Sequence, residues 1–327
     1  MKAEIRPFEE STLSDARKVT GDMFALKVDS ILDKMLENPL RMKSGSPPAG
    51  ELAYQDDSPV AFQGAILRRL FIGQRELCGV VGSTLASHPE TSPVLLMQLM
   101  KTTIRPRGGS ELFFANTSNV ASMKMNRLLG VKGCGPASCE NSRFAPIVWP
   151  RFMKWLLPPA KCKPIDTFES GLFDTFWTRY LKTNTGLVSS RSAEELEWMF
   201  GDGMRDGSVV TLGSFGSDNK LDGYIILRIS QNRKKWMVHD WIAFNNDKRV
   251  LKSLLRSAVW YLRKYKTGLV LEAIGYPDYV KDIISDVLYL KRKMPNNSFI
   301  WEFSDRKSGI PKGSWFFGAY DGDRAMG

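Results

Sequence analysis

The chain has 327 residues, of which 43% are hydrophobic and 25% charged, and its formal net charge at pH 7 is +11. This length favours two domains of roughly 150 residues each, and the composition excludes an intrinsically disordered chain. The excess of basic residues is spread along the chain and forms no tail. It is as consistent with an anionic partner as with a role in keeping the protein in solution.

The cysteines and histidines are too few and too scattered for a metal centre. Cys78, Cys134, Cys139 and Cys162 form no Cys-x-x-Cys pair, and the chain has only two histidines. We therefore expect no metal and reduced thiols, as in cytoplasmic proteins. The start MKAEIRPFEE lacks the apolar core of a signal peptide, and no apolar run approaches the roughly 18 residues of a membrane helix. We expect a cytoplasmic location and no membrane partner.

A hairpin and an alternating series of strands and helices are predicted between residues 50 and 131. The hairpin covers 50–73, with Asp56-Asp57 at its turn. Four segments follow, read as buried strand, amphipathic helix, buried strand and amphipathic helix: 78–90, 92–104, 111–119 and 119–131. Ser92 and Asn119 are suitable N-caps for the two helices, and Pro93 suits a first helical position.

This order of elements, with His88-Pro89-Glu90 at the end of the central strand, resembles the cofactor half of the GNAT acyltransferase superfamily. Asn119 falls on the family's asparagine, 5–8 is similar to its first strand, and 15–27 is similar to its substrate-side helix. The resemblance covers most of the first 135 residues. It implies an α/β (α+β) fold, in which a mixed, mostly antiparallel central sheet is flanked by helices, and an acyl-CoA such as acetyl-CoA as co-substrate.

The resemblance also implies which residues bind the acyl-CoA: Leu85, Ala86, Ser87, Thr91, Ser92, Pro93, Val94, Leu95 and Asn119. The first three lie where the central strand would part from its neighbour, so that their backbone runs beside the pantetheine arm. The segment 91–95 would hold the pyrophosphate at a helix N-terminus. It contains no glycine and no basic residue, unlike the usual phosphate loop of the family, and Asn126 replaces a frequent tyrosine that protonates the leaving thiolate.

The same order of elements is predicted a second time. Ser192 is a suitable N-cap, with Glu195 at capping-box spacing. The predicted elements are a helix over 193–203, a strand hairpin over 208–215 and 221–230, a strand over 236–244, a helix over 248–265, a strand over 267–275, a helix over 278–291 and a strand over 298–304.

This repetition predicts two GNAT-like domains, similar to tandem GNAT-like proteins of bacteria. The predicted organisation is an N-terminal domain over 1–149, a proline-rich linker over 150–172, a more diverged C-terminal domain over 173–304 and a tail over 305–327.

Three titratable residues are candidates for the base that removes a proton from an acceptor amine. His88 lies at the end of the first central strand; the alternative is a surface histidine beside a proline. His239 and Asp240 are neighbours on the equivalent second strand, so their side chains point to opposite faces. The alternative for Asp240 is a buried carboxylate that braces the next loop.

Three functions remain open from the sequence. The first is acyl transfer from acyl-CoA to an amine, such as an amino sugar, an amino acid or a small metabolite. The second is Fem-like transfer of an aminoacyl group from tRNA, which the net charge suits, although no long helical arm is evident. The third is a degenerate, non-catalytic GNAT-like module, which the missing glycines favour. The acceptor, the acyl chain length and the oligomeric state are not determined by the sequence.

Overall fold

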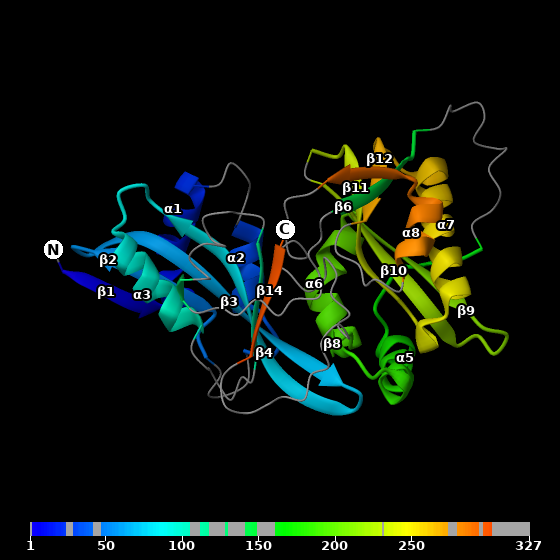
Figure 1. Ribbon diagram of the computed structural model, residues 1–327, viewed down its shortest axis with the longest axis horizontal. Helices are drawn as coiled ribbons and strands as arrows, with labels where there is room; N and C mark the ends of the chain where they lie inside the picture. Colours follow the sequence, from blue (N-terminus) through cyan, green and yellow to red (C-terminus); the bar gives the residue numbers. More distant parts are fainter. Residues whose placement is uncertain are drawn as a thin grey trace.

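The described part of the chain folds around two seven-stranded sheets that lie side by side, each flanked by helices (Figure 1). The computed structural model describes residues 2–23, 29–41, 47–104, 112–117, 128–129, 141–148, 161–230, 232–273, 280–293 and 297–302. Asn119, nearly all of the predicted helix over 119–131, the part of the linker over 150–160 and the predicted tail lie outside these ranges. None of the described helices is both long enough and apolar enough to cross a bilayer.

The first sheet is antiparallel except at one pair of strands. Its spatial order is β1 (Ala3–Pro7), β2 (Gly50–Gln55), β3 (Ser58–Ile72), β4 (Arg75–Ser87), β5 (Leu112–Thr117) and β14 (Asn297–Glu302), with β8 (Leu187–Ser189) paired to β3. Only β4 and β5 are parallel among its described pairs. The predicted hairpin is confirmed as β2 and β3. Asp56 and Asp57 at its turn have φ of 49° and 62°, the left-handed conformation that matches the twist of a two-residue hairpin.

Helices cover both faces of this sheet. A short 3-10 turn (Glu10–Thr12) leads into α1 (Leu13–Met23), and α2 (Asp29–Leu36) follows; both pack on one face, where Ile66 of β3 is buried. The opposite face is covered by α3 (Pro93–Ile104), which buries Leu67 of β3. Alternate residues of β3 therefore enter different cores, as the two-residue period of a strand requires.

The second sheet has the same organisation. Its spatial order is β13 (Leu290–Lys293), β6 (Asn141–Pro146), β12 (Val270–Ala273), β11 (Lys235–Ala243), β10 (Leu221–Ile229), β9 (Val209–Phe215) and β7 (Lys163–Ile165). On one face lie α7 (Lys248–Tyr265) and α8 (Lys281–Val287), and on the other lie α5 (Ser170–Thr183) and α6 (Ala193–Arg205). The predicted capping of α6 is confirmed, because Ser192 accepts a hydrogen bond from the N–H of Glu195.

Each sheet contains strands from the opposite part of the chain: β8 and β14 in the first sheet, and β6 in the second. The strand predicted at 298–304 as the last of the second copy pairs instead with β5 of the first sheet, as β14. Conversely, β6 follows β5 along the chain but pairs with β12 and β13 of the second sheet. The helix predicted over 278–291 ends at Val287, because 290–293 joins β6 as a strand. Burial patterns predict that a segment is a strand but do not identify its partner.

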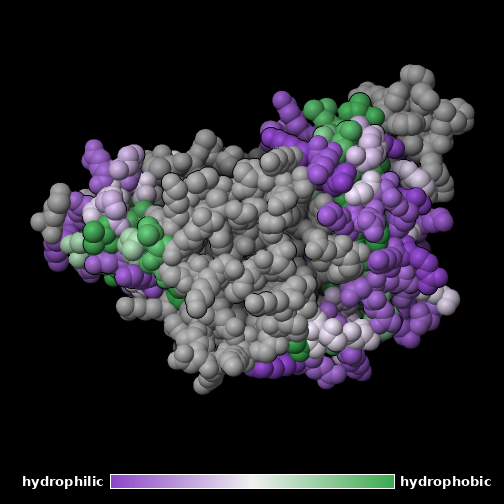
Figure 2. Space-filling view, in the orientation of Figure 1, coloured by the Kyte–Doolittle hydropathy of each residue, from purple (hydrophilic) through white to green (hydrophobic). Residues whose placement is uncertain are grey.

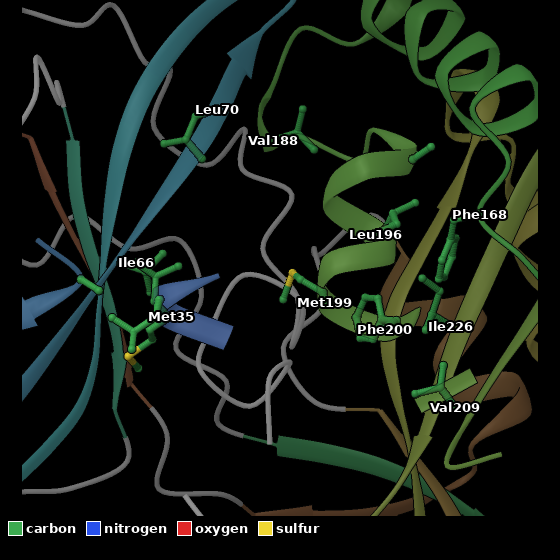
Figure 3. Packing of buried hydrophobic residues seen from close by; sticks show 14 of the residues in the cluster. Met35, Ile66, Leu70, Phe168, Val188, Leu196, Met199, Phe200, Val209 and Ile226 are labelled. Carbon is green, nitrogen blue, oxygen red and sulfur yellow. The ribbon is translucent and has the colours of Figure 1, made fainter. Parts of the chain in front are cut away.

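The two sheets are joined through α6. One apolar cluster runs from Met35 and Ile66 through Met199 and Phe200 to Ile226, so it reaches from the first sheet across the helix to the second (Figure 3). Polar contacts reinforce this junction. The ammonium of Lys34 donates to the carbonyl of Trp198 at 2.7 Å, and the indole N–H of Trp198 donates to the carbonyl of Lys34 at 2.9 Å.

Candidate functional site

The strands β4 and β5 separate within the first sheet. Their parallel pairing ends at Gly82 and Ala115. Beyond this point β4 continues to Ser87 and pairs only with β3 among the described strands, while β5 continues to Thr117 against β14. The backbone N–H and C=O groups of 83–87 that point away from β3 therefore face a gap, and no strand of the described residues lies beside them there.

The three residues predicted to run beside the pantetheine arm lie on this separated segment. Leu85 is half-buried and packs against the core under α3, whereas Ala86 is buried in the core on the opposite face. Ser87 is the last residue of β4. The side chains of Leu85 and Ala86 pack into the two cores. The groups of these two residues that face the gap are therefore their backbone N–H and C=O groups.

A β-bulge lies at the point where the strands separate. Gln63 pairs with Leu85 and Gly64 pairs with Ser83, which leaves Thr84 as an extra residue in β4. Thr84 has a φ of 44°, a left-handed conformation that is rare for a β-branched residue. Bulges re-aim the backbone and occur often beside active sites, and strained residues of this kind gather at functional sites.

Buried polar side chains hold the bulge in place. The side-chain amide of Gln63 donates to the carbonyl of Ser83 at 2.7 Å. Glu51 lies opposite Gln63 on β2 and accepts a hydrogen bond of 2.8 Å from the hydroxyl of Thr103 on α3. All four residues are buried. Buried polar residues of α3, β2 and β3 thus follow one another beneath α3 as far as the bulge of β4.

The sequence analysis missed Thr84, Gln63 and Glu51. A signal was present, since Gln63 interrupts the apolar run PVAFQGAIL of a strand that is buried on both faces. A buried amide needs hydrogen-bond partners, and its presence in such a run indicates a fixed polar contact.

The segment predicted to hold the pyrophosphate forms the turn into α3. The N–H of His88 and the hydroxyl of Thr91 both donate to the carbonyl of Val60, at 2.9 Å and 3.0 Å. Pro93 is the first residue of the helix, and the carbonyl of Ser92 accepts its first backbone bond, from Leu96. His88 and the helix N-terminus therefore both lie at the end of the separated part of β4.

The side chains at this helix start differ in exposure. Val94 is 66% exposed, whereas Leu95 is 4% exposed and packs into the core. The N-terminus of a helix attracts anions through its free N–H groups and its dipole. The exposed side chain of Val94 lies beside this N-terminus and outside the core.

A second bulge and a second end of pairing occur in the other sheet. Within the described residues, β11 pairs with β12 up to Val238 and Ala273. Ile226 of β10 pairs with Asp240 and Leu227 with Val238, which leaves His239 as the extra residue. His239 is 4% exposed, and its ring meets that of Phe200 edge to face at 6.1 Å. This histidine is thus enclosed between β11 and α6.

Asp240 braces the structure, but its partners are Arg191 and Tyr224 and not the next loop that its alternative interpretation named. Its carboxylate accepts hydrogen bonds from Nε and Nη2 of Arg191, at 2.9–3.1 Å, and from the hydroxyl of Tyr224 at 2.8 Å. The side chains of Arg191 and Asp240 are both 0% exposed. Arg191 also donates to the carbonyl of Ser189. This carboxylate joins the segment before α6 to β11, and its hydrogen-bonding capacity is used for that purpose.

The N-terminus of α7 is already capped. The side chain of Asp247 accepts hydrogen bonds from the N–H groups of Arg249 and Val250 and forms an ion pair with the guanidinium of Arg249 at 3.2 Å. These contacts lower the pKa of Asp247, the hydrogen bond from Arg249 most of all. A charged carboxylate occupies the position that an anion would take at this helix.

Comparisons with known proteins bear on the fold. No protein-family model and no curated protein match the sequence. Among solved structures, a probable N-acyltransferase of Enterococcus faecalis V583 aligns over 92% of this chain and 71% of its own, with 11% identity and a TM-score of 0.55. N-myristoyltransferase of Saccharomyces cerevisiae with bound myristoyl-CoA aligns over 99% and 86%, with 12% identity and a TM-score of 0.59. A GCN5-related N-acetyltransferase of Anabaena variabilis aligns over 91% and 72%, with 11% identity and a TM-score of 0.58. The chain therefore has the fold of GNAT-type N-acyltransferases.

Proposed function

We propose that this protein transfers an acyl group from an acyl-CoA to an amine, at the gap between β4 and β5. The observation that supports this most is the coincidence of the end of strand pairing at Gly82 with the bulge at Thr84. A backbone N–H beside a gap can polarise a thioester carbonyl as that carbonyl becomes negative. The similarity to N-acyltransferase structures supports the same reaction class.

In the proposed reaction, the neutral nitrogen of the amine attacks the thioester carbonyl. The C–N bond forms, the C–S bond breaks, and the thiolate of CoA takes up a proton. His88 is our candidate for the base that removes the proton from the amine, since it follows the separated segment directly. The N-terminus of α3 would hold the pyrophosphate. Asp240 and His239 have no part in this proposal, because both are enclosed in packing.

We propose acetyl-CoA as donor, a small amine as acceptor, a bacterial tandem of two GNAT-like units and a cytoplasmic location. The matching order of the two sheets, with a bulge beside the parallel strand in each, supports the tandem. The proposed reaction requires only groups of this chain, the amine and the thioester, and it uses no metal.

The proposal is tested by calorimetric titration of the full chain with acetyl-CoA and with CoA, and by a thiol-release assay with a panel of amines. Val94→Trp places bulk beside the N-terminus of α3 at a side chain that is 66% exposed, and Val148→Trp makes the same change at one that is 60% exposed on the far sheet. We expect Val94→Trp to weaken CoA binding at least about tenfold and Val148→Trp to leave it unchanged. Absence of CoA binding in the natural chain, or equal effects of the two variants, would contradict the proposal.

A second function is favoured by one observation, the segment 91–95 with no glycine and no basic residue. It is a non-catalytic module that binds an acyl-CoA. Binding of acetyl-CoA without thiol release from any amine in the panel would support this module over the enzyme. Fem-like transfer from aminoacyl-tRNA would be indicated by transfer that requires the tRNA and proceeds without CoA.

A further inference from the structure

The outer face of α7 is basic along its length. Its apolar residues, among them Leu251, Leu254 and Leu255, are buried against the second sheet. The helix contains no acidic residue, and its basic residues are Lys248, Arg249, Lys252, Arg256, Arg263 and Lys264. By contrast, α3 has a single basic residue, Lys101, although it follows β4 in the same way as α7 follows β11. Hydrophilic residues dominate the part of the surface that carries α7 and α8 (Figure 2).

A cavity of about 310 Å³ opens on this face. Its walls include four cationic side chains, those of Lys161, Arg249, Lys252 and Arg256, together with the ring of Trp260. The volume is at the small end of the range found for small-molecule sites. The cavity lies along the outer face of the helix and thus apart from the gap between β4 and β5.

The segment that carries Lys161 is fixed to α7. The N–H of Cys162 donates to the hydroxyl of Ser257 at 3.3 Å, and the sulfur of Cys162 lies 4.0 Å from the hydroxyl of Ser253. Cys162 is 3% exposed, and β7 follows it at Lys163 and pairs with β9. The backbone that carries Lys161 is therefore held against α7 by a packed residue.

The carboxylates of the described residues do not balance the positive charges in the cavity. Arg249 pairs with Asp247 at 3.2 Å, and Lys252 pairs with Asp286 at 2.6 Å. Within the described part of the chain, neither Lys161 nor Arg256 forms an ion pair. Four cations thus meet two carboxylates, which leaves an excess of two positive charges. A phosphate group carries up to two negative charges at neutral pH and accepts hydrogen bonds from Arg and Lys.

We propose that this cavity binds a phosphorylated small molecule that carries a flat ring, such as a nucleotide, independently of the acyl-transfer site. The phosphates would lie between Lys161 and Arg256, where the uncompensated charge is, with Lys252 beside them. The ring would pack on Trp260, because aromatic faces attract planar rings. The capped N-terminus of α7 is excluded as the anion site by Asp247, so the phosphates lie farther along the helix.

The test is calorimetric titration of the full chain with ATP and with inorganic pyrophosphate. Arg256→Gln removes one exposed cation of the cavity, and Lys248→Gln removes an exposed cation of the same helix outside it. We expect saturable binding of both ligands, weakened about tenfold or more by Arg256→Gln and less than about twofold by Lys248→Gln. Trp260→Leu should weaken the binding of ATP and leave that of pyrophosphate nearly unchanged.

Several results would overturn the proposal. One is the absence of saturable binding of either ligand up to about 1 mM. Another is equal weakening by Arg256→Gln and Lys248→Gln, together with tighter binding of a mixed-sequence RNA oligonucleotide, which indicates a general basic surface. A third is loss of ATP binding in Val94→Trp but not in Arg256→Gln, which places the nucleotide at α3. That last result would leave the acyl-CoA proposal intact, so the two proposals fail separately.

Discussion

The side-chain amide of Gln63 reaches the carbonyl of Ser83 at 2.7 Å, at the residue before the left-handed Thr84. Both partners are buried. The contact joins the middle of β3 to the bulge of β4, so it fixes the conformation of the backbone at which the proposed thioester would lie. Gly64 beside it leaves space for Met35, since a Cβ there would lie 2.7 Å from the Met35 Cε.

Replacement of Gln63 by methionine should destabilise the fold and weaken the site. Gln63→Met keeps the length of the side chain but leaves the buried carbonyl of Ser83 without this donor, at a cost of about 1–3 kcal/mol. Urea unfolding measures the loss, and CoA titration measures the weaker binding that a relaxed bulge would give. Gln98→Met changes an exposed glutamine of α3 and should alter neither quantity. Equal effects of the two changes would show that the amide contact has no particular role.

Replacement of Thr84 by glycine should stabilise the fold. A non-glycine residue in a strained left-handed conformation costs about 1–3 kcal/mol, whereas an added glycine costs about 0.5–1 kcal/mol through the entropy of the unfolded chain. The change also removes the 3.0 Å contact between the hydroxyls of Ser83 and Thr84. We expect the free energy of unfolding to rise by up to about 1–2 kcal/mol.

The matched control for this change is Thr211→Gly. Thr211 is a buried residue in a regular part of β9. Glycine there removes packing and the 3.7 Å hydrogen bond from its hydroxyl to the Met204 sulfur, and it adds entropy to the unfolded chain, so the variant should lose about 1–2 kcal/mol. If Thr84→Gly were destabilised as much as Thr211→Gly, the left-handed conformation of Thr84 would not be strained.

The spacing of apolar residues predicted most helices and strands, because the buried face of each segment repeats with the period of its own helix or strand. The helix expected over 248–265 coincides with α7, since its apolar residues recur at helical spacing and Asp247 caps it. The strand partners were not predictable in this way. Nothing in 141–146 or 297–302 indicates that each strand joins the sheet of the other half, because the identity of a neighbouring strand depends on the whole topology.

The site was predictable only in part for a related reason. The family pattern placed Leu85–Ser87 on the strand that separates from β5. It could not predict Thr84 as the bulged residue, because a bulge appears only when the registers of two strands are compared. Asp240 was selected for its carboxylate, yet its partner Arg191 is 49 residues away in the sequence. Long-range polar contacts of this kind leave no local signal.

The buried pair of Asp240 and Arg191 predicts a large loss of stability on substitution. Asp240→Asn leaves the guanidinium of Arg191 buried without a compensating charge, and breaking such a pair typically costs about 3–5 kcal/mol. Asp218→Asn is the control, because Asp218 pairs with Lys220 at 2.6 Å but both side chains are more than half exposed. An exposed pair contributes about 0–1 kcal/mol. Chemical unfolding compares the two variants, and similar small losses would refute the bracing role.

Glu195 predicts a dependence of stability on pH. Burial raises the pKa of Glu195 above its ordinary value of 4.5, although the guanidinium of Arg69 lies 2.7 Å away. Between the ordinary and the raised value, the folded chain holds a proton that the unfolded chain has released, so the free energy of unfolding falls as pH rises through this window. Glu195→Gln does not titrate. The free energy of unfolding of this variant, relative to that of the natural chain, should therefore increase as pH rises from about 4.5.

The control for Glu195 is a glutamate whose pKa is shifted in the opposite direction. The hydrogen bond from Arg41 lowers the pKa of Glu10 to about 2, so the stability that Glu10 contributes is present above the ordinary glutamate value and is lost as pH falls toward 2. For Glu10→Gln, the difference from the natural chain should decrease as pH rises, although it will be small because Glu10 is largely exposed. Urea unfolding at a series of pH values measures both differences. A difference that decreases with pH for Glu195→Gln as well would mean that the attraction of Arg69 outweighs burial, and that Glu195 is a charged partner of β3 throughout the acidic range.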